Sequence, residues 1–139
     1  MARKTSPPLV EENQPKPNDF EAILRYHRHL SRLLDFVTKH IDEPISLSDV
    51  AADAGISSSR LSSLFREKTG TVFHEWLRAK RIQLAQELLR ANEQRISDVA
   101  FSVGFRSSRT FERSFMIVTG TTASDFRKSI TNKLTQSQR

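Results

Sequence analysis

The chain has 139 residues and a formal net charge of +6, which favours a polyanionic partner, nucleic acid before a membrane surface. It contains no cysteine, and this excludes disulfides, thiolate metal sites and thiol nucleophiles. No apolar run approaches the roughly 18 to 20 residues of a membrane span, and the N-terminus lacks the apolar stretch of a signal peptide, so we expect a soluble cytoplasmic, nucleoid-associated protein.

The first 18 residues predict a disordered tail, because they combine four of the five prolines with Lys, Glu and Asn. From Phe20 the pattern changes, and apolar residues recur at three- and four-residue steps as far as Ile41. This spacing predicts one amphipathic helix that ends before Pro44. We expect residues 19–71 to hold this helix and a first helix-turn-helix.

An internal repeat is the most informative feature of the sequence. The stretch SDVA at 48–51 returns 49 positions later at 97–100, and TGT at 69–71 returns 50 positions later at 119–121. The change of spacing places one extra residue in the second copy, just after Gly104. Two copies of one small motif are therefore predicted.

Each copy is predicted to form a helix, a turn and a second helix. In the first copy Ser46 can cap a helix, with Asp49 three residues on, and Gly55 suits the left-handed residue that ends it. The next helix is expected to start at Ser57 or Ser58. Its inward face is an apolar stripe of Leu61, Leu64 and Phe65.

A longer linker helix, residues 72–93, is expected between the copies, and the second copy occupies residues 94–130. This copy departs from the first at the helix cap, where Arg95 stands in place of Ser46. Residues 131–139 are expected to be a C-terminal tail. The predicted fold is all-α, with two helix-turn-helix subdomains joined by a long linker helix and about seven helices in all.

The outward faces of the two second helices are polar and differ in chemistry. Serine hydroxyls let a helix approach DNA closely but discriminate weakly between bases, whereas arginine can bind the O6 and N7 atoms of guanine. Glu112 could accept from a cytosine amino group or orient a neighbouring arginine. The outward residues of the first helix are Ser58, Ser59, Ser62, Ser63 and Arg66, and those of the second are Ser108, Arg109, Glu112, Arg113 and Met116.

The second copy, ISDVAFSVGFRSSRTFERSFMIVTGTTASDFRKS, contains I-x-x-[IV]-A, V-G-F, S-x-x-x-F-x-R-x-F, a glycine and an aromatic-Arg pair. It resembles the signature of the DNA-binding domain of the AraC/XylS transcription regulators, and the central WLRAKRIQLAQELL resembles their linker helix. The resemblance covers roughly Leu33 to Ser129. It implies a DNA-binding regulator that activates transcription through contact with RNA polymerase, similar to the small stand-alone members of the family.

Carried over residue by residue, the resemblance implies base or phosphate contacts from both second helices. These come from Ser58, Ser59, Ser62 and Ser63 in the first, and from Ser108, Arg109, Thr110, Glu112 and Arg113 in the second. Two departures stand out. The three serines at 59, 62 and 63 replace larger side chains that are common in the family, and Met116 and Ile117 replace a pair that is usually basic.

Two recognition helices held by a linker helix are expected to enter successive major grooves, about 34 Å apart. Because their outward faces differ, the site should be asymmetric and a monomer should suffice. Contacts to backbone phosphates are expected from basic and hydroxyl side chains, namely Arg66, Lys68, Thr71, Arg81, Arg106, Thr121 and Lys128.

Three alternatives remain at this stage. One is a protein-interaction module that binds RNA polymerase or another regulator and for which DNA binding is secondary. Such a module would not need Arg109 and Arg113. An enzyme is not favoured, because there is no H-E-x-x-H, G-x-S-x-G or P-loop, and no cofactor or metal site is expected; His27 and His29 are interpreted as solvated. A membrane-binding helix over Phe20 to His40 is less plausible than a core helix.

Overall fold

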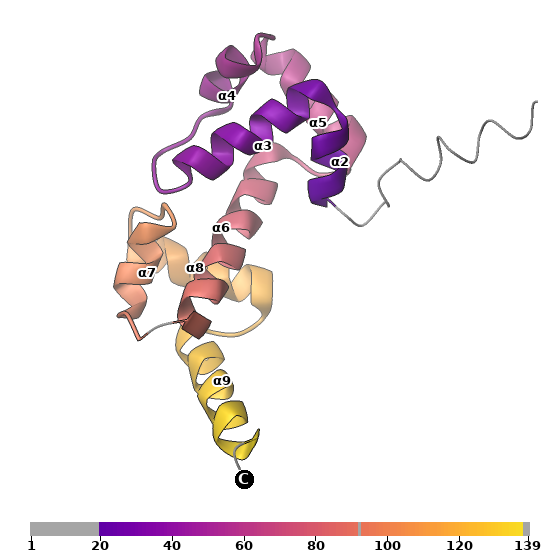
Figure 1. Ribbon diagram of the computed structural model, residues 1–139. Coiled ribbons are helices and arrows are strands. Elements are labelled where there is room, and N and C mark those ends of the chain that lie inside the picture. The colour runs from indigo at the N-terminus through magenta and orange to yellow at the C-terminus, as the bar shows by residue number, and fades with distance from the viewer. Residues whose placement is uncertain (1–19, 92, 138–139) are drawn as a thin grey trace, which may run out of the picture. The chain divides into compact units, whose positions relative to one another are not determined.

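The computed structural model describes residues 20–91 and 93–137, with side chains up to residue 132. These residues form helices and no strand, which confirms the predicted all-α class (Figure 1). The predicted N-terminal tail, 1–18, lies outside the described residues. Eight helices lie within them: α2 (Phe20–Tyr26), α3 (Arg28–His40), α4 (Leu47–Ala54), α5 (Ser58–Thr69), α6 (Phe73–Ala91), α7 (Ile96–Ser102), α8 (Ser108–Thr119) and α9 (Ala123–Ser137).

The described chain divides into two compact units. Unit 1 comprises residues 20–40 and 45–73, and therefore helices α2 to α5. Unit 2 comprises residues 41–44 and 74–137, with nearly all of α6 and the whole of α7 to α9. The predicted linker helix thus belongs to the second unit, where its apolar side chains help to build the core.

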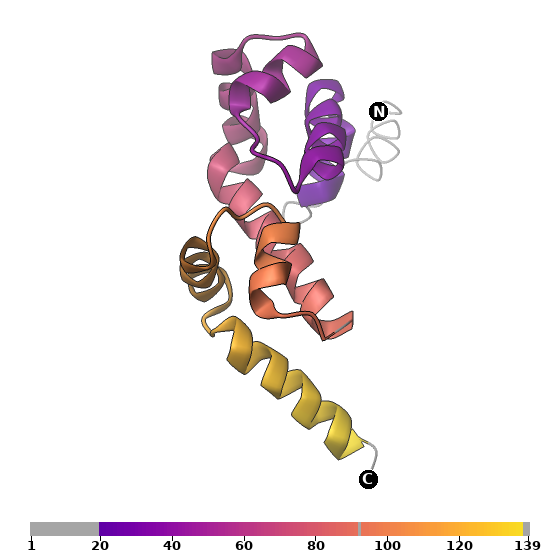
Figure 2. The same ribbon diagram turned by 90° about the vertical axis from the view of Figure 1, so that its left-hand side faces the viewer.

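The single helix predicted from Phe20 to Ile41 is wrong, because the chain breaks at His27 into α2 and α3. Leu24 and Leu30 are both fully buried, although six positions along one continuous helix would place them about 120° apart around its axis. The break lets both side chains enter one core. It also lets α2 pack against α3 (Figure 2) and against α5. Because the break divides one predicted helix into two, the described residues contain more than the seven helices expected.

The predicted caps of the first helix-turn-helix are confirmed. The Ser46 hydroxyl accepts a hydrogen bond from the Asp49 backbone N–H at 3.1 Å, and Ser57 accepts from the Arg60 N–H at 3.2 Å. Between them Gly55 ends α4 with φ of 79°, in the left-handed region. These contacts satisfy backbone groups that helix ends leave without intrahelical partners.

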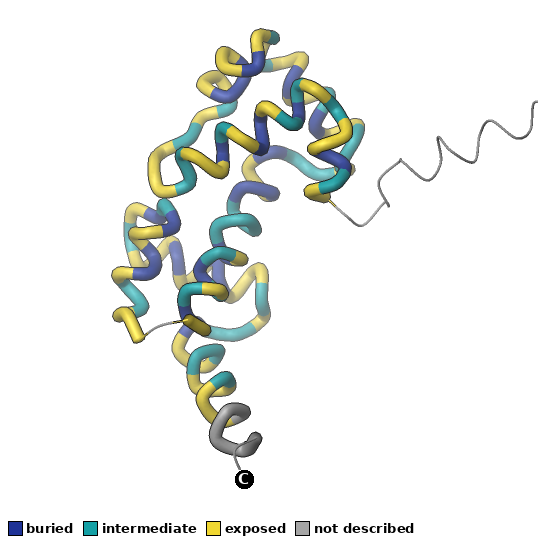
Figure 3. The backbone as a smooth tube through the Cα atoms, viewed as in Figure 1, coloured by how far each residue is buried: buried dark blue, intermediate teal, exposed yellow. Residues whose placement is uncertain are grey.

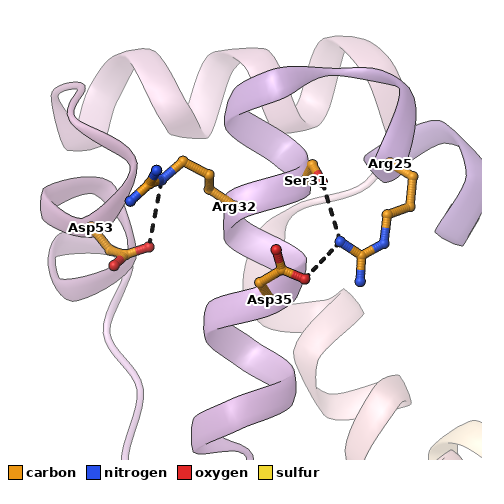
Figure 4. A network of polar contacts seen from close by, with 5 residues as sticks. All are labelled: Arg25, Ser31, Arg32, Asp35 and Asp53. Carbon is orange, nitrogen blue, oxygen red and sulfur yellow. Dashed lines mark hydrogen bonds and ion pairs between the residues drawn. The ribbon is translucent and has the colours of Figure 1, made fainter.

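Two surface ion pairs connect helices of unit 1 (Figure 4). Arg25 of α2 lies 2.6 Å from the Asp35 carboxylate and donates to the Ser31 hydroxyl at 3.1 Å. Arg32 of α3 lies 3.9 Å from Asp53 of α4. All four charged side chains are well exposed, so each pair contributes at most about 1 kcal/mol and the apolar core carries the stability.

Unit 2 is built on a cluster of phenylalanines. The rings of Phe105 and Phe111 meet edge to face at 5.3 Å, and Phe111 lies 5.7 Å from Phe115. One side of α6 covers them with Ile82 and Ala85, both fully buried. Figure 3 shows buried positions alternating with exposed ones along helices such as α3, as an amphipathic pattern requires.

Arg81 fixes the short segment 41–44 within unit 2. Its Nε donates to the Ile41 carbonyl at 3.2 Å and its Nη2 to the Glu43 carbonyl at 2.7 Å. Burial lowers the pKa of the Arg81 guanidinium, which is the expected direction when a cation loses water. Gly104 lies beside this contact with φ of 101°, and a Cβ there would meet the Ile41 carbonyl oxygen at 2.3 Å.

The internal repeat appears in the structure as matched hydrogen bonds. The Thr69 hydroxyl donates to the Phe65 carbonyl at 2.7 Å, and the Thr119 hydroxyl donates to the Phe115 carbonyl at 2.8 Å. In each copy the same hydroxyl accepts from the backbone N–H two residues on. The two second helices, α5 and α8, therefore end in the same way.

The second unit agrees with the sequence prediction at one helix end and departs from it at another. Arg95 makes no side-chain cap at the start of α7 and instead lies 3.4 Å from the Asp98 carboxylate. The C-terminal tail predicted for residues 131–139 is wrong over most of its length, because α9 continues to Ser137. Residues 138–139 lie outside the described part of the chain.

Candidate nucleic-acid interface

The outward face of α8 is fixed by its cap and its core side chains. The Ser107 hydroxyl accepts from the Thr110 N–H at 3.1 Å and donates to the Thr110 hydroxyl at 3.0 Å. Phe111 and Phe115 are fully buried, which turns the opposite side of the helix to solvent. The exposed side chains are those that the sequence singled out, Ser108, Arg109, Thr110, Glu112, Arg113 and Met116.

The equivalent face of α5 is formed in the same way by burial of Leu61 and Phe65. It exposes Ser59, Ser62, Ser63 and Arg66, as the sequence predicts. Ser58 differs, because it is half-buried and its hydroxyl donates to the Ser48 hydroxyl at 3.3 Å. This bond joins the start of α5 to α4.

The two exposed faces offer different chemistry on the same scaffold. The α8 face carries two guanidinium groups and one carboxylate, which recognise base edges by hydrogen bonds. The α5 face carries short hydroxyls and the single guanidinium of Arg66, which suit phosphate contacts and close approach of the backbone. A duplex read by both helices would therefore be read unequally.

The structure divides the predicted phosphate-contacting residues into three groups. Arg66, Arg106 and Lys128 are exposed. Lys68, Thr71 and Thr121 are half-buried, and Lys68 lies 3.5 Å from the Glu67 carboxylate. Arg81 differs from all of these, since its two hydrogen bonds to carbonyls favour a structural role over phosphate contact.

The sequence prediction missed a polar pocket beside α5. The pocket has a volume of about 440 Å³ and lies between the α2–α3 junction and α5. His27 and His29, which are interpreted as solvated from the sequence, are half-buried and line it. The remaining lining residues are Arg28, Arg60, Ser63, Leu64 and Glu67. Only the break at His27 brings these side chains together, and the uninterrupted periodicity of the sequence concealed it.

An apolar group is exposed at the end of α8. Met116, Ile117 and Val118 have exposed fractions of 45%, 58% and 40%. Three consecutive exposed apolar residues at the end of a recognition helix are not needed for the core. Their position at the end of α8, beyond the arginines, is suited to contact with a protein or with the edge of a duplex.

The described residues contain no cluster of three or more His, Asp or Glu side chains that could hold a metal ion. Within the same residues, no helix is both long enough and apolar enough to cross a membrane.

The fold and its exposed faces define a double helix-turn-helix protein of the kind that inserts helices into DNA grooves. A family model described as a helix-turn-helix domain matches residues 50–129. The chain belongs to the AraC-type family of DNA-binding transcription regulators, and its relatives are regulators, not enzymes.

Individual relatives support this assignment. The chain is 33% identical over 104 residues to the regulatory protein SoxS of Salmonella typhimurium, covering 75% of this chain and 97% of SoxS. It is 35% identical over 97 residues to the right origin-binding protein of Escherichia coli K12, covering 70% of this chain and 34% of that protein. The solved DNA-binding domain of AdpA, in complex with a target DNA, matches with a TM-score of 0.72 and 25% identity, covering 77% of this chain and 96% of that domain.

Proposed function

We propose that the chain reads an asymmetric duplex site as a monomer, with α5 and α8 each entering a major groove. Support comes from one observation above all: two helices with equivalent caps expose different side chains. The exposed guanidiniums of Arg109 and Arg113 can each hold a guanine, whereas the serines of α5 discriminate weakly. Such a reader has no need of a second copy, because each half of its site meets a different helix.

Replacement of Arg113 by alanine is expected to weaken binding to a cognate duplex by about 1–3 kcal/mol, roughly ten- to a hundred-fold in Kd. The loss should be concentrated at one or two base pairs in the half of the site that α8 reads. Fluorescence anisotropy with a labelled duplex and its single-base variants measures both effects.

The matched control is Arg95→Ala, which removes the same charge from an exposed position outside the two reading faces. Equal losses for Arg95→Ala and Arg113→Ala would mean that Arg113 contributes only to the general positive field.

We propose that Arg66, Arg106 and Lys128 contact backbone phosphates, assisted by Lys68, Thr71 and Thr121. Each phosphate neutralised by a basic side chain adds about 0.9 to the slope of log affinity against log salt concentration. The exposure of the first three supports this assignment. Arg81 is left out, because its guanidinium already holds the carbonyls of Ile41 and Glu43.

We further propose that the protein acts in the cytoplasm as an activator that contacts RNA polymerase at a promoter. The similarity to SoxS, a regulatory protein, supports regulation of this kind. Run-off transcription from a promoter carrying the selected site tests it: added protein should increase transcript, and the Arg113→Ala variant should not.

A second candidate function is a protein-interaction module in which DNA binding is secondary. The exposed apolar residues Met116, Ile117 and Val118 favour it, since a protein partner would cover them. The exposed arginines of the same helix favour the DNA reader. Replacing the three apolar residues by Asn, Gln and Thr separates the two functions. An interaction module would then lose its regulatory activity in transcription, while its affinity for DNA stays constant.

A further inference from the structure

The pocket between the α2–α3 junction and α5 is rich in cationic and protonatable groups. Arg28 and Arg60 line it together with His27 and His29. Glu67 is the single carboxylate of the lining, and it already lies 3.5 Å from the Lys68 ammonium. The lining therefore carries an excess of positive charge, which two histidines can increase.

Three polar groups of the pocket have capacity for a further ligand. The Nδ1 atom of His29 is buried and has no hydrogen-bond partner among the described residues. Neither Arg28 nor Arg60 forms an ion pair within residues 20–91 and 93–132. A buried polar atom without a partner and two unneutralised guanidiniums fit an oxyanion, which accepts hydrogen bonds from all of them.

We propose that this pocket is a binding site for a phosphate group or a similar tetrahedral oxyanion, held by Arg60 and Arg28 with His27 and His29. Its volume of about 440 Å³ is ample for a phosphate ester. Arg60 supplies a bidentate guanidinium from α5, and the histidine rings supply donors from the α2–α3 junction. The site depends on the break at His27. Three of its four proposed ligands, His27, Arg28 and His29, precede residues 50–129, which the family model matches, whereas Arg60 lies within them.

The position of the pocket links it to the DNA-reading surface. Ser63 lines the pocket and also belongs to the exposed face of α5. The phosphate can therefore come from the backbone of bound DNA or from a free phosphate ester. In the first case the pocket adds a contact to the duplex, and in the second it places an effector beside the recognition helix. This link to DNA rests on the proposed function, whereas oxyanion binding by the pocket is independent of it.

Binding should tighten as the pH falls. Desolvation, followed by the nearby Lys68 charge, lowers the pKa of His27, while Glu67 acts in the opposite direction. A bound dianion favours the protonated His27 ring and raises its pKa, so binding takes up protons. The charged groups that face this ring are Arg28, Arg60, Glu67 and Lys68.

The test is a titration with sulfate, whose charge is constant over this pH range, followed through the histidine ring signals by NMR at constant ionic strength. We expect saturable shifts of the His27 and His29 rings, with His40 and His74 as internal controls outside the pocket. Arg60→Ala should weaken the affinity about ten-fold, while Arg95→Ala leaves it unchanged. Affinity should fall between about pH 5.5 and 7.5.

A second titration, with cognate duplex, identifies the source of the phosphate. If the duplex shifts the same rings and sulfate competes with it, the DNA backbone occupies the pocket. If the duplex binds without moving these rings, the occupant is a free phosphate ester. The proposal is overturned if sulfate moves all four histidines alike, moves none of them, or binds the Arg60→Ala variant as tightly as the wild type. None of these results depends on whether DNA binds.

Discussion

Gly104→Ala is expected to destabilise unit 2 by about 3 kcal/mol or more. An alanine with φ of 101° is strained by roughly 1–2 kcal/mol. Its Cβ would also lie 2.3 Å from the Ile41 carbonyl oxygen and 2.7 Å from the Arg81 Nε, so backbone must move. That movement disturbs the hydrogen bond between Arg81 and Ile41 and adds a further cost of about 1–3 kcal/mol.

The matched control is Gly55→Ala in the first helix-turn-helix. Gly55 also has positive φ, 79°, but a Cβ there would meet nothing within 4 Å. Its substitution should cost only about 1 kcal/mol, from strain alone. Denaturation in urea, followed by helical circular dichroism, compares the two variants. Equal losses of stability in the two variants would show that the steric contact with Ile41 does not contribute to the cost of Gly104→Ala.

Phe111→Ala is expected to cost about 3–5 kcal/mol, because the ring is fully buried and its removal leaves a cavity that the helices cannot close. Its ring contacts with Phe105 and Phe115 would be lost together. Since α8 is part of this core, the DNA reading that we propose for Arg113 should be lost at temperatures where unit 2 unfolds. Fluorescence of Trp76, the sole tryptophan of the chain and a buried residue of unit 2, reports the transition.

The control for this variant is Phe101→Ala on the neighbouring helix α7. Phe101 is 51% exposed, and removal of its ring should change stability by no more than about 0.5 kcal/mol. A loss at Phe101 as large as that at Phe111 would contradict the assignment of the core. Both variants replace phenylalanine by alanine, so the difference between them measures the effect of burial.

The helix-turn-helix units could be predicted because their determinants are local. Ser46, Gly55 and Ser57 act through their own backbone neighbours, so sequence spacing specifies them. The apolar stripes around Leu61 and Phe111 have helical spacing, and the same spacing predicts which side chains of α5 and α8 are exposed. The repeat added a second copy of most of these signals, although Arg95 stands in place of the Ser46 cap.

What the sequence concealed depends on contacts between distant segments. The apolar periodicity from Phe20 continues through His27, so the sequence pattern gives no sign of a break there. The break accompanies the packing of α2 against α5, which is distant in the sequence. Arg81 has the pattern of a surface cation, yet it contacts carbonyls 38 and 40 positions away. The pocket follows from the same break. These features arise from tertiary structure, which no local spacing encodes.

Selection of duplexes from a random pool, with wild type and Arg113→Ala at two salt concentrations, tests the central claim most directly. The double reading head predicts an asymmetric motif with two submotifs about one helical turn apart, and loss of the half read by α8 in the variant. Higher salt should weaken binding without changing the motif. Sequence reading by this protein would be contradicted if the selected duplexes share no motif, and if their affinity falls steeply with salt and is the same for wild type and Arg113→Ala.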